Sequence, residues 1–344
     1  MQESSEPIIV PMLYVSRSGS TMWARYLSRH LADAVVLPET RWVELLLVHG
    51  DARLRGADAD ALWCTMRIDG RIVEMFGGRA SARAFAREHA GKGVGSLVVA
   101  TGRWLAARQG KECKFLVIKH GELMHYVPSM RKMFRSLLPM HVVRDPRGAA
   151  ASPFRNQHLT GRRLTPGVLW RQARRWRELS VRVRRWREAG GSVVRVHYER
   201  VVASPQAEVA RFAEQVGADF RTDPQPGWEY RLPGRDRGIH GLLYRAPDAT
   251  RVESWKHELP PHLGVVVERA TWGEMQALGY VPWFVPRASL TFQGRALGTA
   301  WVDLVTERAQ HARSRVRFAL ANPDAGWLRL RTAMRRLQDR WEGG

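Results

Sequence analysis

Residues 8–27 form the sequence IIVPMLYVSRSGSTMWARYL, and this stretch decides the fold class. An apolar, β-branched run ends in a loop of small polar residues, and a segment compatible with a helix follows at once. A strand, a small-residue loop and a helix in this order direct backbone N–H groups and a helix N-terminus to one point, which favours anion binding. Arg17 can add a planar, permanently charged guanidinium for phosphate or sulfate oxygens. The alternative is an ordinary polar turn between a strand and a helix.

The loop differs from the nucleoside triphosphatase loop. The pattern G-x-x-x-x-G-K-[ST] requires a first Gly and a Lys, and this loop has neither. A kinase of that type would also need a magnesium-binding Asp on a strand, which the sequence does not offer. The sequence therefore disfavours a P-loop kinase.

Composition limits the class of protein further. The chain has 344 residues, 44% of them hydrophobic, which is enough for one large core with an appendage or for two small domains. Cys64 and Cys113 are the only cysteines, and their spacing indicates neither a disulfide framework nor a metal centre. The first residues lack the pattern of a secretory signal, and the apolar runs are no longer than a strand. We expect a cytoplasmic protein that uses no metal.

The charge of the chain is strongly positive. Lys and Arg number 55 against 33 Asp and Glu, for a formal net charge of +22. Such a balance predicts affinity for polyanions such as nucleic acid, anionic lipid, acidic peptides or charged glycans. The alternative is a solvated, arginine-rich surface. Basic residues are concentrated in 162–187 and 313–340.

The pattern along the chain predicts an α/β protein. Continuous apolar strands are expected at residues 8–15, 115–119, 138–143 and 192–197, and they alternate with helical segments. Such alternation is typical of a parallel sheet covered on both faces. Helices are expected at 22–30, 42–48, 94–108, 122–134, 165–189 and 205–216. Residues 51–93 are expected to form an insertion of short helices on the substrate side, and 223–251 a functional loop.

The segment 165–191 illustrates the helix signals. Thr165-Pro166 supplies a cap residue followed by Pro in the first turn, and Gly190-Gly191 ends the run. Apolar residues recur at helical spacing between them, so the helix is expected to pack its apolar stripe on the sheet. The residues of this stripe are Leu169, Ala173, Trp176, Ser180, Val183 and Trp186.

Residues 141–152, HVVRDPRGAAAS, carry a more specific signal. They resemble the second nucleotide-binding signature of sulfotransferases that use 3′-phosphoadenosine 5′-phosphosulfate (PAPS). In that family an Arg and a Ser bind the 3′-phosphate, and Arg144 and Ser152 fall at the family's interval. The opening loop resembles the family's 5′-phosphosulfate loop, although Ser16 stands where a Pro is usual.

Two further stretches, Val196–Glu199 with Ser204-Pro205 and Ser254–Lys256 with Leu259, match the same family in order along the chain. The resemblance implies a P-loop-like, three-layer α/β fold with a central parallel sheet over residues 1–285. Residues 286–344 would then be a basic helical C-terminal extension. The family's Arg-Lys-Gly is replaced here by Asp248-Ala249-Thr250, so Arg251 or Thr250 would take over its task. The implied nucleotide-binding residues are Arg17, Ser18, Gly19, Ser20, Thr21, Trp23, Arg144, Ser152, Tyr198, Arg251, Trp255 and Lys256.

Sulfuryl transfer needs positive charge at the leaving phosphate and a base for the acceptor. Arg17 and Lys119 are the expected cations, although Lys119 could merely end a strand. Glu39 resembles the base of tyrosylprotein sulfotransferases, which carry a similar Glu-Thr-Arg segment. His120 lies one position before the catalytic His of cytosolic sulfotransferases, and a slip of one residue turns a strand side chain to the other face. Glu39 is therefore the first candidate for the base and His120 the second.

The expected acceptor is a hydroxyl or an amine of a glycan, natural product, lipid or peptide, and the basic surface favours an anionic one. A nucleic-acid-binding protein with a degenerate P-loop is the alternative, but it does not explain the ordered motifs. Nucleic acid is therefore a less favoured partner. Residues 328–341 carry an apolar stripe that could pack on the domain, form a homodimer or contact an anionic membrane.

Overall fold

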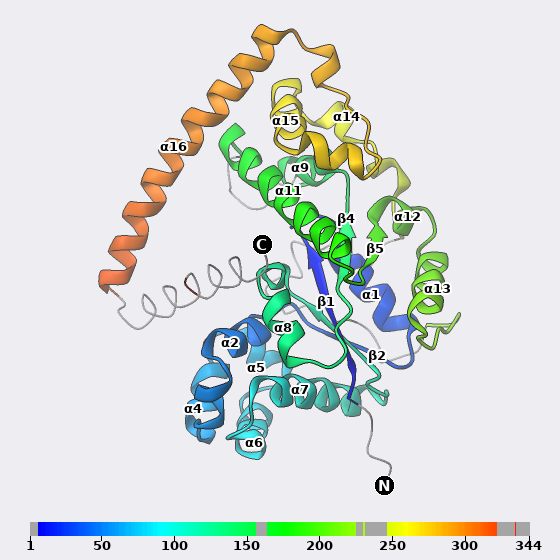
Figure 1. Ribbon diagram of the computed structural model, residues 1–344, viewed down its shortest axis with the longest axis vertical. Helices are drawn as coiled ribbons and strands as arrows, with labels where there is room; N and C mark the ends of the chain where they lie inside the picture. The colour runs from blue at the N-terminus through cyan, green and yellow to red at the C-terminus, as the bar shows by residue number, and fades with distance from the viewer. Residues whose placement is uncertain (1–5, 156–163, 225–229, 231–245, 322–333, 335–344) are drawn as a thin grey trace.

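The computed structural model describes residues 6–155, 164–224, 230, 246–321 and 334. Its centre is a five-stranded, fully parallel sheet with the strand order β2-β3-β1-β4-β5 (Figure 1). The strands are β1 (Ile8–Tyr14), β2 (Ala34–Leu37), β3 (Phe115–Lys119), β4 (Met140–Val143) and β5 (Val194–His197). The α/β class with a central parallel sheet is confirmed.

Strand β2 was not predicted from the sequence. It has only four residues, AVVL, between a helix and Pro38, which is too short to show a period of its own. All four residues are buried, and they pair with Phe115–Ile118 of β3. Tertiary pairing therefore makes this segment a strand. Its last residue, Leu37, lies at the carboxyl edge of the sheet.

Helices cover both faces of the sheet and so form three layers. One face packs on α1 (Ser20–His30), α12 (Tyr198–Ala203) and α13 (Pro205–Val216). The other packs on α2 (Trp42–His49), α7 (Val94–Gln109), α8 (Val127–Met133) and the second half of α11 (Pro166–Glu188). Short helices fill residues 51–89, namely α3 (Asp51–Arg55), α4 (Ala59–Met66), α5 (Gly70–Met75) and α6 (Arg79–His89). A 3₁₀ turn, η1 (Gly121–His125), links β3 to α8.

A third apolar cluster lies beside the sheet. It joins α9 (Pro146–Arg155) and the first half of α11 to α14 (Trp255–Glu258) and α15 (Pro261–Ala277). Thr165 caps α11 by accepting a hydrogen bond from Val168 N at 3.4 Å. The predicted stripe of α11 is buried except for Trp186, which is partly buried. Leu169 and Ala173 pack in this third cluster, whereas Val183 packs on the sheet as predicted.

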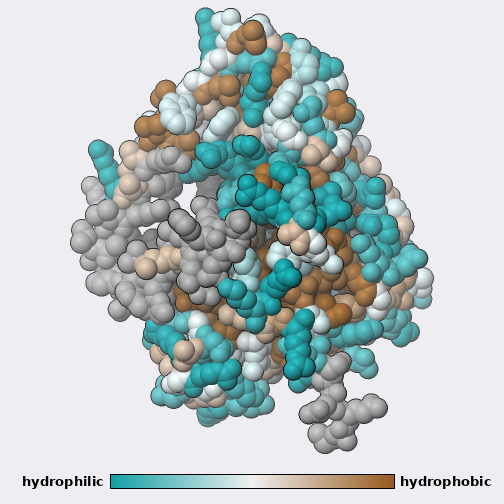
Figure 2. Space-filling model, in the orientation of Figure 1, coloured by the Kyte–Doolittle hydropathy of each residue, from teal (hydrophilic) through white to brown (hydrophobic). Residues whose placement is uncertain are grey.

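Two short 3₁₀ turns, η3 (Ala249–Arg251) and η4 (Val285–Arg287), precede the long helix α16 (Leu290–Ala321). The first part of α16 packs against α11 and α15 through the buried Ala296, Ala300 and Leu304. Gly167 permits this approach, since a Cβ there would lie 2.8 Å from the Leu304 amide nitrogen. Apolar side chains also gather on the surface along α16 (Figure 2), where Trp301 and Val302 are exposed.

The helix predicted at residues 328–341 lies outside the described residues, apart from Met334. Among the helices that the structure describes, none is both long and apolar enough to cross a lipid bilayer.

Candidate active site

The loop after β1 has an unusual backbone. Arg17 has φ 72°, and among the described residues it is the only non-glycine residue with a positive φ. Backbone strain of this kind is typical of ligand-binding and active sites. Gly19 has φ 83°, and a Cβ there would lie 2.3 Å from Cδ2 of Tyr198. Glycine is therefore required at residue 19 for both its conformation and its close contact with the Tyr198 ring.

The first and second motifs of the sequence meet at this loop. Arg17 Nε donates to Ser152 Oγ at 2.9 Å, and Arg144 Nη1 donates to the Arg17 carbonyl at 3.1 Å. The Arg144 guanidinium lies 4.0 Å above the ring of Tyr198. Four of the predicted nucleotide-binding residues, 17, 144, 152 and 198, therefore form one cationic cluster at the carboxyl ends of β1, β4 and β5.

The loop itself is suited to an anion. Ser18 is 2% exposed, and its hydroxyl is buried with no hydrogen-bond partner among the described residues. Ser20 and Thr21 begin α1, whose N-terminal amides carry partial positive charge. A hydroxyl that lacks a partner beside two guanidiniums is what a phosphate-bearing ligand would satisfy. The residues present thus fit a ligand that carries phosphate or sulfate groups.

Residue 251 reaches this cluster through its backbone. The Arg251 carbonyl accepts a hydrogen bond from Arg144 Nη2 at 3.3 Å. Its side chain is turned back, because Arg251 Nε donates to Asp248 Oδ2 at 3.0 Å. Thr250 also bonds Asp248, through both its amide and its hydroxyl. The structure thus places the Arg251 backbone next to Arg144, and Asp248 holds the side chains of both replacement candidates.

Two predicted nucleotide-binding tryptophans lie in the core. Trp23 is 1% exposed and donates to Met140 Sδ at 3.0 Å, below the loop. Trp255 is 3% exposed and packs 3.7 Å under the Arg147 guanidinium. Trp23 thus packs beneath the loop and Trp255 beneath the Arg147 guanidinium, and their assignment to nucleotide binding stays a prediction. Lys256, the neighbour of Trp255, forms an ion pair with Glu253 at 2.7 Å.

Arg147 belongs to the same buried scaffold. Its guanidinium bonds Asp145 at 2.7 Å and Glu268 at 2.8 Å, and Glu268 also accepts from the backbone amides of residues 283–285. Burial disfavours the charge on Arg147, but its two carboxylate partners outweigh burial and raise the pKa of the guanidinium. This network fixes the start of α9, which carries Ser152.

A second cluster lies at the ends of β1, β2 and β3. The Lys119 side chain is fully buried and forms an ion pair with Glu39, and its Nζ donates to the Tyr14 hydroxyl at 3.3 Å. Glu39 keeps 39% of its side chain exposed, so the carboxylate faces solvent on one side. Burial opposes its ionisation, but Lys119 outweighs burial, and the pKa of Glu39 is lowered. The carboxylate is therefore ionised at neutral pH.

The two phenols at this cluster were not predicted from the sequence. Burial and the nearby Glu39 carboxylate raise the pKa of Tyr14, so this phenol stays protonated. The Tyr230 hydroxyl accepts a hydrogen bond from the Glu39 amide at 3.1 Å. Tyr14 could have been suspected as the last residue of β1, and Tyr230 lies in the segment 223–251, which was predicted to be a functional loop without any single residue being named.

His120 is held in a different way. Its Nε2 lies 3.4 Å from Glu44 Oε2, and Arg41 Nε contacts the same oxygen at 2.8 Å. Glu44 is 1% exposed, and although burial opposes its charge, His120 and Arg41 lower its pKa. Glu44 was also missed, although its place three residues after Arg41 at the start of a helix is a usable sequence signal.

The structure thus brings both base candidates near the Lys119 strand end, and each has its own charged partner. In the described part of the chain, no group of three or more His, Cys, Asp or Glu side chains is arranged to hold a metal ion.

Comparison with known proteins supports the class of protein that the fold and site define. The model of the sulfotransferase family matches residues 12–222 of this chain. This match covers more than half of the chain, and the protein therefore belongs to the sulfotransferase family. No curated protein matches the chain significantly.

Solved structures give the same fold. The sulfotransferase domain of the Synechococcus PCC 7002 olefin synthase is 14% identical, with a TM-score of 0.57 over 81% of this chain and 97% of that one. A sulfotransferase domain of the curacin biosynthetic pathway is 15% identical, with a TM-score of 0.53 over 81% of this chain and 99% of that one. At these identities the likeness concerns the fold.

Proposed function

We propose that the protein transfers the sulfuryl group of PAPS to a hydroxyl or amine of an acceptor. The observation that carries this proposal is the joining of the first and second motifs by the Arg17–Ser152 hydrogen bond, beside the strand end that holds Lys119 and Glu39. PAPS, when bound, supplies the activated sulfuryl group and leaves as 3′-phosphoadenosine 5′-phosphate (PAP).

The nucleotide would be held by the loop and by the cationic cluster. Arg17, Ser18 and the first residues of α1 offer donors for the 5′ groups, while Arg144 and Ser152 offer donors for the 3′-phosphate. These groups are fixed before any ligand arrives, because Tyr198 supports Arg144 and the Arg17 carbonyl accepts from it. Preorganised donors of this kind lower the barrier to charge development on a leaving phosphate.

Lys119 and Glu39 would have separate roles in transfer to the acceptor. The buried ammonium of Lys119 is suited to the oxygens of the group in transit, and the Glu39 carboxylate is suited to accept the acceptor's proton. Tyr14, kept protonated, accepts a hydrogen bond from Lys119 and is also hydrogen-bonded to the Glu39 carboxylate at the same strand end. His120 remains the second candidate for the base, with Glu44 fixing its ring.

The candidate acceptors are the glycans, natural products, lipids and peptides expected above. The net charge of +22 favours an anionic one. A screen of labelled PAPS against such acceptors would identify it. A preceding thermal-shift comparison of PAP, ATP and DNA tests the proposal itself. Stabilisation by PAP well beyond that by ATP supports it. A salt-dependent response to DNA without a response to PAP would favour the nucleic-acid-binding alternative.

The choice of base has its own test. Glu39→Gln should keep PAP affinity near that of the wild type, while transfer to the identified acceptor falls about a hundred- to ten-thousandfold. His120→Ala should cost much less. The reverse result would assign the base to His120.

A further inference from the structure

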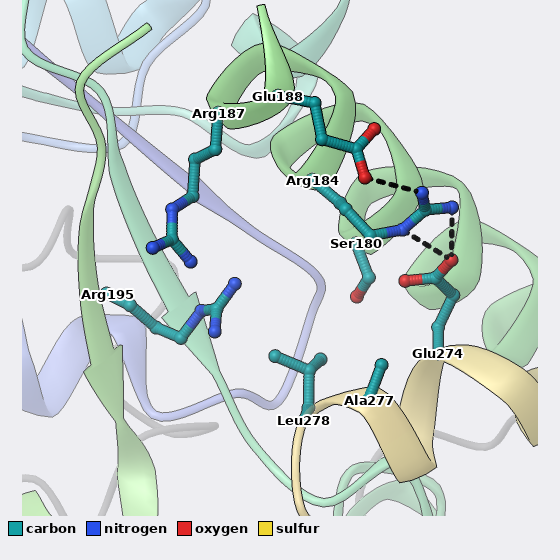
Figure 3. A pocket seen from close by; sticks show the side chains of 8 residues that line it. All are labelled: Ser180, Arg184, Arg187, Glu188, Arg195, Glu274, Ala277 and Leu278. Carbon is teal, nitrogen blue, oxygen red and sulfur yellow. Dashed lines mark hydrogen bonds and ion pairs between the residues drawn. The ribbon is translucent and has the colours of Figure 1, made fainter. Parts of the chain in front are cut away.

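A pocket of about 370 Å³ lies outside the site described above, between the second half of α11, strand β5 and the end of α15 (Figure 3). We call it the arginine pocket. None of its residues belongs to either cluster of the candidate active site. It is lined by Ser180, Arg184, Arg187, Glu188, Arg195, Glu274, Ala277 and Leu278.

One of its three arginines is neutralised inside the pocket. Arg184 donates to Glu274 Oε1 through Nε at 3.2 Å and through Nη2 at 2.9 Å. Its Nη1 donates to Glu188 Oε1 at 3.0 Å. Both acids that line the pocket are therefore turned to Arg184 (Figure 3). Arg184 is therefore the guanidinium that both acids pair with directly.

The other two arginines have no such partners. Arg187 extends from α11 and Arg195 from β5, with their guanidiniums turned toward each other (Figure 3), and within the described residues neither forms an ion pair. Arg195 Nε is buried and has no hydrogen-bond partner in the described part of the chain. Burial and then the charge of Arg187 lower the pKa of the Arg195 guanidinium. Because a guanidinium keeps its proton at neutral pH, the lowered pKa indicates a charge that needs compensation.

A second group with an unsatisfied nitrogen is adjacent to Arg195. His141 is the β4 partner of Arg195 in the sheet register, and it shares a sheet face with Val143, which packs against Trp176 of α11. Its side chain is buried, and Nδ1 has no hydrogen-bond partner among the residues described. Burial and then Arg195 lower the pKa of His141 to about 3. Buried polar groups are rarely left without partners, and a bound ion is one explanation for such exceptions.

We propose that the arginine pocket binds a small oxyanion of the phosphate or sulfate class, either free or as the head of a small ester. Two facing guanidiniums without acidic partners provide the planar donors that such oxygens accept. The volume is at the lower end of the range of small-molecule sites, so it admits a group larger than a bare tetrahedral ion. A bound dianion would remove the repulsion between Arg187 and Arg195.

Inorganic phosphate is the first probe, in a titration of the whole chain followed by thermal unfolding and calorimetry. Saturating PAP is present throughout, so that phosphate does not compete for the nucleotide loop. In phosphate-free buffer we expect Arg195→Gln to raise or preserve the unfolding temperature, because a repelled buried charge is removed. Its affinity for phosphate should fall about ten- to a hundredfold, as expected for a lost charge-assisted hydrogen bond.

Arg185→Gln is the matched control, since Arg185 is an exposed arginine of the same helix that does not line the pocket. It should leave phosphate binding unchanged. Arg187→Gln, on the exposed side of the pocket, repeats the test if Arg195→Gln fails to fold. Equal loss of phosphate affinity in the pocket variants and in Arg185→Gln would overturn the proposal, as would phosphate affinity unchanged in both pocket variants.

Crystals soaked in selenate and in a phosphate monoester locate the site and separate the two ligand sources. An anomalous selenium peak between Arg187 and Arg195 supports the proposal, and peaks confined to other places contradict it. Ordered density for the monoester in the pocket assigns an ester head, whereas density for selenate alone assigns a free ion. Neither result depends on PAP binding, so this proposal and the proposed function can fail separately.

Discussion

Replacing Arg144 by alanine separates recognition of the 3′-phosphate from general nucleotide binding. The Arg144 guanidinium makes contacts of two kinds. It stacks on the Tyr198 ring at 4.0 Å and donates to the carbonyls of Arg17 and Arg251, and the proposed function adds bonds to the 3′-phosphate. Only the last of these contacts depends on which nucleotide is present.

The magnitude follows from this division. A charge-assisted hydrogen bond is worth roughly 1.5–3 kcal/mol, so PAP should bind about ten- to a hundredfold more weakly to Arg144→Ala. The lost bonds to the carbonyls of Arg17 and Arg251 weaken PAP and ADP by the same factor, so the additional loss for PAP over ADP is about ten- to a hundredfold. The ratio of the PAP and ADP affinities is therefore the informative quantity.

Isothermal calorimetry with PAP and ADP measures both affinities on the same preparation. Tyr198→Phe is the matched control, because it keeps the ring under Arg144 and should leave the ratio unchanged. Equal weakening of PAP and ADP by Arg144→Ala would refute the reasoning, because Arg144 would then act only through the loop.

Three further predictions concern stability. Gly19→Ala should destabilise the fold by roughly 2–4 kcal/mol in urea unfolding, because it adds a steric clash to a positive φ. Gly190→Ala, at φ 78° with open space around its Cβ, should cost clearly less stability. Equal losses in the two variants would show that the clash with Tyr198 contributes nothing. Lys119→Met should cost less stability than Glu39→Gln, because Lys119→Met removes the buried ammonium whereas Glu39→Gln removes the carboxylate that compensates it. The opposite order of the two losses in urea unfolding would argue against this ion pair. The pKa of His141 is about 3 in the folded state, below the usual 6.5. The contribution of neutral His141 to the free energy of unfolding is therefore complete above pH 6.5 and is lost as the pH falls towards 3, by up to about 1.4 kcal/mol per pH unit. If His141→Gln loses stability in acid as steeply as the wild type does, this prediction is wrong.

The sequence by itself determined the class of fold and the edge of the sheet at which the site lies. The strand, small-residue loop and helix of residues 8–27 are local in the chain, as is the interval between Arg144 and Ser152. Local spacing also predicts α11, since the cap at Thr165 and the helical period of its apolar residues act within the segment itself. Parallel strands follow from continuous apolar runs that alternate with helices, and their carboxyl ends then meet at one edge.

Only the tertiary structure decided what faces what at that edge. Strand β2 exists because it pairs with β3, and it brings Glu39 to Lys119, which lies 80 positions away in the sequence. The Arg17–Ser152 bond spans 135 positions. No local pattern carries such distances, because they depend on the order of the strands in the sheet.

The same reason explains why Trp23 and Trp255 lie in the core and why the arginine pocket was not predicted. A motif fixes the type and spacing of residues, whereas the direction of each side chain is set by the elements that pack around it. Arg187 and Arg195 come from a helix and an edge strand that sequence analysis predicts separately. Their facing each other across a pocket is a property of the packing between those elements, and the arginine-rich composition alone does not reveal it.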